Sequence, residues 1–311
     1  MTARRITTLE QASALCGTLV WVLLACLAGS GHAQLGVIEL LFLFAPLVIV
    51  PLGLALGRRV SPVHPSAEAL LRWLQPLAAG FTVVSFWFGP GRFAAILAVP
   101  WLLFCGIMAV TGALSLLSAE DRTPASWATN IGRMDLAIAG GWLMISRMGL
   151  RPLGIQEPIV LLTAVHFHYT GFATALLAGT LCAYAGRKRL LGILVFLVIV
   201  VPFLVAAGFV WSATLKMAAA LLLCVCLVVL AGSQLWIAGD LSSRVARTYL
   251  RMSSLAVVLG MVLASVYAIG DWLKQDWLVV PRMASTHGVL NGLGFALLGM
   301  LGWLVQMSEN R

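Results

Sequence analysis

Apolar runs of about twenty residues recur along the whole chain, separated by short segments that contain charged residues, proline or glycine. A run of roughly that length crosses the hydrocarbon core of a bilayer as one α-helix. The pattern therefore predicts an all-α fold, a polytopic transmembrane helix bundle of about ten spans (9–10). We expect these spans at about residues 12–28, 36–57, 69–88, 92–117, 126–149, 158–185, 190–211, 216–239, 245–270 and 283–306.

The composition indicates that lipid is the main environment of the chain. Hydrophobic residues make up 61% of the 311 residues and charged residues 10%, whereas a soluble globular protein has about 45–50% and about 25%. The predicted spans leave little chain for a domain outside the membrane. We therefore expect residues 1–311 to form a single integral membrane domain with the lipid bilayer as its main partner.

The net charge of +9 does not indicate a nucleic-acid partner, because the lysines and arginines lie at the ends of the apolar runs and form no continuous basic face. Their distribution instead predicts the topology through the excess of basic residues in cytoplasmic loops. We expect the N-terminus and the C-terminus in the cytoplasm. The basic residues that this orientation places on the cytoplasmic side are Arg58, Arg59, Arg122, Arg187, Lys188, Arg189, Arg244, Arg247 and Arg251.

Three of the five histidines fall inside apolar runs, His166 and His168 in the sixth expected span and His287 in the tenth. Imidazoles are costly to hold away from water unless they form hydrogen bonds, titrate or bind a ligand. Residues two apart on a helix are separated by about 200°, so His166 and His168 face opposite sides. With the predicted topology, all three lie in the outer half of the membrane.

These histidines have polar neighbours that extend the candidate site. His166 shares a helix face with Tyr169, and His287 shares one with Asn291. We expect His166, His168, His287, Tyr169 and Asn291 to bind a cofactor or small ligand. Imidazoles from two helices with a carboxylate are an ordinary set of ligands for a transition metal, and the candidate metal ligands are His166, His168, His287 and Glu39. The alternative is that the histidines only form hydrogen bonds between helices and fix the packing.

Arg133 and Asp135 lie within the fifth expected span. An ionisable group at mid-membrane is a candidate functional residue, here for coupling transport to an ion. Alternatively, Arg133 extends to the cytoplasmic surface and Asp135 bonds to a neighbouring helix. The chain has no HExxH, GxSxG, zinc-finger spacing or Gly-rich phosphate loop, so the mechanisms of soluble enzymes have no support.

Two stretches, Leu162–Phe172 and Met283–Phe295, and more weakly Ala45–Val48 with Pro51, resemble the YndJ-like family of bacterial membrane proteins. The likeness covers most of the chain as a hydropathy pattern, and its specific part is the two histidine stretches. The resemblance implies a multi-pass protein of the bacterial inner membrane, without an established activity. A transporter label is sometimes attached to such sequences.

Three hypotheses follow. In the first, the histidine site binds a metal, haem or small ligand, and any enzyme activity is a redox or lipid-modifying reaction on an apolar substrate. In the second, the protein is a permease for a small molecule or an ion and uses the same cavity, with Asp135 and Glu39 as coupling groups. In the third, it is a scaffold whose polar residues only pack helices.

Overall fold

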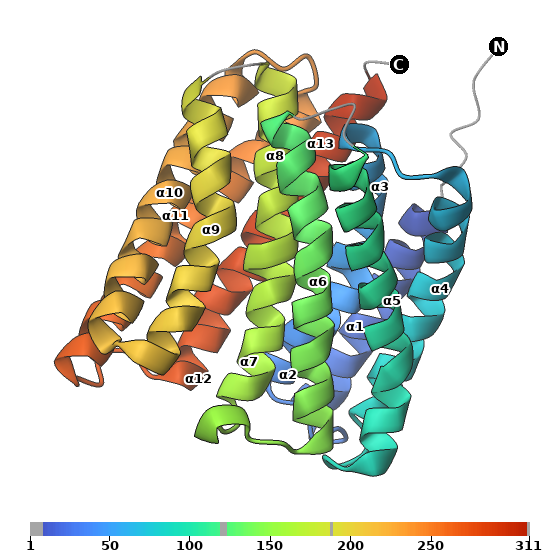
Figure 1. Cartoon of the computed structure of the whole chain (residues 1–311), viewed down its shortest axis with the longest axis vertical. Helices are drawn as coiled ribbons and strands as arrows, with labels where there is room; N and C mark the ends of the chain where they lie inside the picture. Colours follow the sequence, from blue (N-terminus) through green and yellow to red (C-terminus); the bar gives the residue numbers. More distant parts are fainter. Residues whose placement is uncertain (1–8, 119–122, 187–188, 310–311) are drawn as a thin grey trace.

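The computed structural model describes residues 9–118, 123–186 and 189–309, and every regular element within these ranges is a helix (Figure 1). Element η2 is a 3₁₀-helix, and η1, η3, η4 and η5 are π-helices. In chain order the elements are α1 (Leu9–Gly29), α2 (Val37–Phe44), η1 (Ala45–Ile49), α3 (Val50–Val60), α4 (Pro65–Ser85), α5 (Arg92–Leu117), α6 (Pro124–Met148), η2 (Pro152–Gly154), α7 (Ile159–His166), η3 (Phe167–Thr174), α8 (Ala175–Ala185), α9 (Arg189–Trp211), α10 (Ala213–Gly239), α11 (Arg244–Leu273), α12 (Val280–Met283), η4 (Ala284–Gly288), η5 (Leu290–Leu297) and α13 (Leu298–Glu309).

The predicted all-α polytopic bundle is confirmed. Among the described residues, 8 helical passes are long and apolar enough to cross a membrane. Several α- and π-helical elements join into one pass, as α2, η1 and α3 do over Val37–Val60. Helices α4 and α6 run alongside these passes in Figure 1 but are more polar. With them, the described chain has the number of long helices that the apolar runs predict.

The beginning of α1 and the end of α13 lie at the same end of the bundle. Glu10 of α1 forms an ion pair with Arg58 at the end of α3, over 3.2 Å. Nη1 of Arg59 donates a hydrogen bond to the carbonyl of Leu304 in α13, over 3.1 Å. This agrees with an even number of passes, and assigning this end to the cytoplasm remains a prediction. Three residues used for that prediction, Arg122, Arg187 and Lys188, lie outside the described residues.

Helix α6 has a capped beginning and a glycine at its end, and small residues let it pack closely against its neighbours. Oγ1 of Thr123 caps its first turn by accepting from the Ser126 N–H at 3.3 Å. Gly149 ends the helix with a φ of 71°, a left-handed conformation that favours glycine. Gly112 of α5 and Gly140 of α6 allow close approach of these two helices, because a Cβ at Gly112 would lie 2.5 Å from the carbonyl oxygen of Asn130. Helix α6 also packs against α7, η3, α8 and α9.

Candidate functional site

Three of the spans contain π-helical turns, and these turns meet inside the bundle. Elements η1, η3 and η5 each contact the other two. A π-helical turn inside an α-helix is rare and often marks a functional position. The same three spans contain the two histidine stretches and the proline segment near residue 46. The structure therefore brings together the three stretches on which the family resemblance was based.

The prolines of the second span leave two carbonyl groups free, and neighbouring spans use both. Pro46 has no N–H to bond the Leu41 carbonyl, which instead accepts a hydrogen bond from the Tyr169 hydroxyl at 2.9 Å. Pro51 likewise cannot bond the Pro46 carbonyl, which accepts from Nε2 of Gln75 at 2.7 Å. These bonds hold η3 against α2 and α4 against η1. Tyr169 therefore positions two spans, and its hydroxyl already has a partner.

His168 is fully buried, and both of its ring nitrogens have partners. Nε1 of Trp101 in α5 donates to Nε2 of His168 at 3.2 Å. Because an indole N–H can only donate, this Nε2 is the accepting nitrogen and Nδ1 carries the ring proton, which it donates to the Ala164 carbonyl at 2.8 Å. The Phe42 ring packs edge-on against the imidazole. His168 thus joins α5, η3 and α2 as a neutral side chain.

His166 points the other way, as the two-residue spacing predicts, and its side chain is exposed on the span. Its Nδ1 lies 2.7 Å from the Leu162 carbonyl. Nδ1 of His287, which is half-buried in η4, lies 2.8 Å from the Gly260 carbonyl of α11. A carbonyl only accepts, so both Nδ1 atoms carry the ring proton and each neutral ring keeps its lone pair on Nε2.

The elements that carry these two imidazoles, α7 and η4, both pack against α2. The spans that carry them also pack together, since a Cβ at Gly292 would lie 3.4 Å from the Tyr169 ring. Asn291 supports His287 by donating from Nδ2 to the His287 carbonyl at 2.8 Å. Close approach of α11 requires Gly260, where a Cβ would lie 2.6 Å from Nδ2 of Asn291.

The four candidate metal ligands do not form one group. Among residues 9–118, 123–186 and 189–309, no three His, Cys, Asp or Glu side chains gather in a way that could hold a metal ion. His168 has both nitrogens occupied. Glu39 lies in the first turn of α2, where its Oε2 would be 2.8 Å from a Cβ at Gly36. His166 and His287 are therefore the two members of the predicted set that have Nε2 lone pairs available.

Arg133 and Asp135 do not pair with each other. The guanidinium of Arg133 donates from Nη1 to Oδ1 of Asn130 and from Nη2 to the Ser61 carbonyl, both at 2.6 Å. Asp135 lies on another face of α6, against Gly171 of η3, where a Cβ would be 2.9 Å from its Oδ2. Arg133 and Asp135 therefore do not act as a pair: Arg133 is held by its own hydrogen bonds, and Asp135 is a separate carboxyl group.

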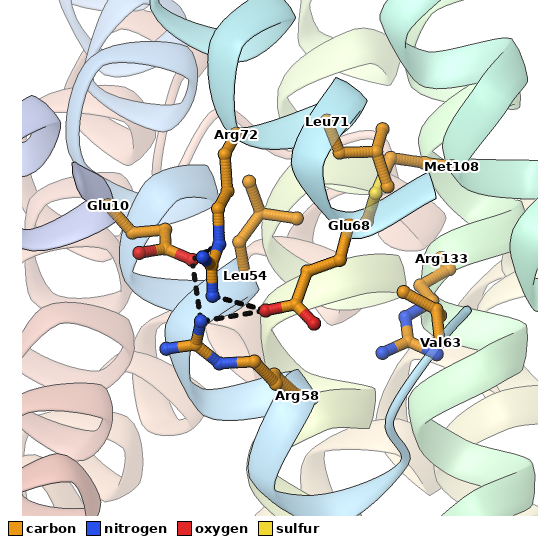
Figure 2. Close-up of a pocket in the computed structure, with 9 residues that line it drawn as sticks. All are labelled: Glu10, Leu54, Arg58, Val63, Glu68, Leu71, Arg72, Met108 and Arg133. Atoms are coloured by element: carbon orange, nitrogen blue, oxygen red, sulfur yellow. Dashed lines mark hydrogen bonds and ion pairs between the residues drawn. The ribbon is translucent and has the colours of Figure 1, made fainter. Parts of the chain in front are cut away.

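A charged cluster at the end of the bundle that contains the start of α1 was not predicted (Figure 2). Oε1 of Glu10 contacts Nε of Arg72 at 2.7 Å, and Oε1 of Glu68 contacts Nη1 of Arg58 at 2.7 Å. Arg58 also pairs with Glu10, and Arg72 with Glu68. A cavity of about 20 Å³ lies beside these side chains, enough for one water molecule. The spacing of Glu68 and Arg72, four residues apart, was a signal for part of this cluster.

The helices and their apolar surfaces define a multi-pass α-helical membrane protein. The model of the YndJ-like protein family matches residues 40–295, and the chain belongs to that family. It is 26% identical over 276 residues to the uncharacterized membrane protein YndJ of Bacillus subtilis (strain 168). That match covers 88% of this chain and 50% of the relative, so the chain spans about half the length of this relative. No solved structure matches the chain.

Proposed function

We propose that this protein binds a small ligand inside the membrane, through Nε2 of His166 and Nε2 of His287. The observation that carries the proposal is the shared arrangement of the two rings. Each Nδ1–H is held by a backbone carbonyl, from Leu162 and from Gly260. A hydrogen bond of this kind fixes the orientation and tautomer of a ligand-binding imidazole.

The ligand must accept a nitrogen lone pair, which describes a hydrogen-bond donor or a metal ion. The side chain of His166 is exposed on a membrane-spanning segment, so we propose that the ligand enters from the lipid. Two protein nitrogens alone do not complete the coordination of most transition metals. A metal or haem would therefore bring further ligands of its own. A redox or lipid-modifying reaction would likewise use a reactive group on the ligand, because the imidazoles supply only lone pairs.

The permease hypothesis requires different groups. Arg133 is held by Asn130 and Ser61, and Glu39 lies half-buried in the first turn of α2. Of the coupling residues predicted from the sequence, Asp135 is the buried carboxyl group, 4% exposed, and within the described residues it has no ion pair or hydrogen bond. The scaffold hypothesis describes His168 well, since all of its hydrogen bonds are internal.

The test is co-purification of a ligand with the full chain in mild detergent. Metal analysis and an absorption spectrum detect a metal or haem, and mass spectrometry of the organic extract detects a lipid-soluble donor. We expect one compound at about one per chain in the unmodified protein, and its loss in both His166→Ala and His287→Ala. His32→Ala is the matched control, because His32 lies in an exposed turn and its side chain bonds only to Ser30 within the described residues. Equal recovery of every metal and lipid in all four proteins would overturn the proposal.

A further inference from the structure

Asp135 lies near the middle of α6, which extends from Pro124 to Met148. Two carboxylate side chains among the described residues are less than a tenth exposed, Glu10 at 3% and Asp135 at 4%. Glu10 has two arginine partners. Within the described part of the chain, the Asp135 carboxyl has no hydrogen bond and no ion pair. Glu10 thus lies beside positive charges, whereas Asp135 has no ion-pair partner among the described residues.

Charged and titratable groups on the neighbouring elements do not compensate Asp135. Arg133, two residues away on α6, is bonded to Asn130 and Ser61 on the side of the bundle where α1 begins. On the facing turn of η3, His168 is neutral and bonded to Trp101 and Ala164. The other titratable or charged residues on elements that pack against α6 are Arg58, Arg59, Arg92, Cys105, His166, Tyr169, Cys182, Tyr184 and Arg189. None of these forms an ion pair or a hydrogen bond with Asp135.

An ionised carboxylate in such surroundings would be an uncompensated buried charge, which is strongly unfavourable, whereas the protonated acid is neutral. We infer that Asp135 is a proton-binding site inside the membrane, which carries its proton in the structure described and releases it when water reaches the carboxyl group. This site is separate from the ligand site at His166 and His287.

The packing around Asp135 connects the bound proton to the shape of the bundle. Gly171 leaves room for the carboxyl group, and it lies in the π-helical turn that also contains His168 and Tyr169. A change in the charge of Asp135 would change its contact with that turn. This π-helical turn, η3, also contacts η1 and η5. Proton binding is therefore placed where it can shift three spans against each other.

A hydrophobic carbodiimide tests the proposal, because this reagent enters the membrane and reacts with protonated carboxyl groups. The acid proton moves to one carbodiimide nitrogen, while the carboxyl oxygen forms a bond to the central carbon. The O-acylisourea rearranges to a stable N-acylurea that retains all atoms of both reactants. Peptide mass mapping of the full chain in liposomes locates the adduct without any substitution.

We expect the adduct at Asp135, absent in Asp135→Asn and retained in Asp135→Glu. Glu10 is the internal control, since it is equally buried but paired, and it should stay unmodified. Above the pH at which Asp135 loses its proton, labelling should fall about tenfold per pH unit, because only the protonated fraction reacts. Absence of label at Asp135 from acidic to alkaline pH would overturn the inference. Protection by sodium ions at constant pH would overturn it in favour of a sodium site.

Discussion

Trp101 of α5 and His168 of η3 form a buried hydrogen bond in which the indole N–H donates to Nε2 over 3.2 Å. Both side chains are 0% exposed, and their rings stack with centroids 5.8 Å apart. The pair joins two spans that are distant in sequence. It also occupies Nε2 of His168, the nitrogen that has no partner among the described residues in His166 and His287.

Removal of the Trp101 donor should destabilise the bundle. Trp101→Phe leaves the accepting nitrogen of His168 buried without a partner, which costs about 1–3 kcal/mol. We expect a lower thermal midpoint for the purified protein in detergent. Trp127→Phe is the control, because Trp127 is 48% exposed on α6. Adding His168→Phe should cost less in the Trp101→Phe background than in the unmodified protein, and simple additivity would contradict the proposed contact.

Tyr169→Phe should weaken the contact between the sixth and second spans. The change leaves the Leu41 carbonyl, which Pro46 cannot bond through a backbone N–H, without its hydroxyl donor. We expect a loss of about 1–3 kcal/mol in unfolding free energy, measured by thermal unfolding in detergent. Tyr184→Phe is the matched control, since Tyr184 is 38% exposed. Equal midpoints for the two variants would show that the hydroxyl bond does not contribute.

Gly171→Ala should overpack the interface between α6 and η3. The added Cβ would lie 2.9 Å from Cβ and Oδ2 of Asp135, and overpacking of this kind costs about 1–3 kcal/mol. Gly80→Ala is the control, because nothing lies within 4 Å of a Cβ there; in a helix this change should be neutral or stabilising. Combination of Gly171→Ala with Asp135→Ala should recover part of the loss. No recovery would place the clash elsewhere.

Glu10→Gln should loosen α1 from the rest of the bundle. The substitution removes the charge that Arg58 and Arg72 share at Oε1 of Glu10. Hydrogen bonds to charged groups contribute about 1.5–3 kcal/mol, so we expect a lower thermal midpoint and faster proteolysis near the beginning of α1. Asp276→Asn, in an exposed loop, should change neither quantity. An unchanged Glu10→Gln variant would mean that apolar packing alone holds α1.

Hydropathy was sufficient for the helices because lipid imposes the same requirement on every span. A backbone inside a bilayer must satisfy its own hydrogen bonds, so each long apolar run forms a helix. The predicted run at 92–117 corresponds to α5 over Arg92–Leu117. The two-residue spacing also placed His166 and His168 on opposite sides, since helical geometry depends on local sequence alone.

The candidate site was predicted only in part, because partner atoms come from distant parts of the chain. The bond from Trp101 to His168 crosses 67 residues, and that from Arg133 to the Ser61 carbonyl crosses 72. No local pattern distinguishes a histidine with two partners from one with a free nitrogen. The cluster of Glu10, Arg58, Glu68 and Arg72 was missed because, apart from the pair Glu68 and Arg72, its members come from distant parts of the chain.

The amino-acid sequence by itself determined the membrane environment, the positions of the spans and the opposite orientations of His166 and His168, because these follow from burial in lipid and from the geometry of one helix. The tertiary structure alone decided that π-helical turns of three spans meet and that His168 is fully bonded. It also decided that, among the described residues, His166 and His287 keep a free nitrogen and Asp135 has no partner. These features depend on which atoms of different helices come into contact, and a single helix carries no information about its neighbours.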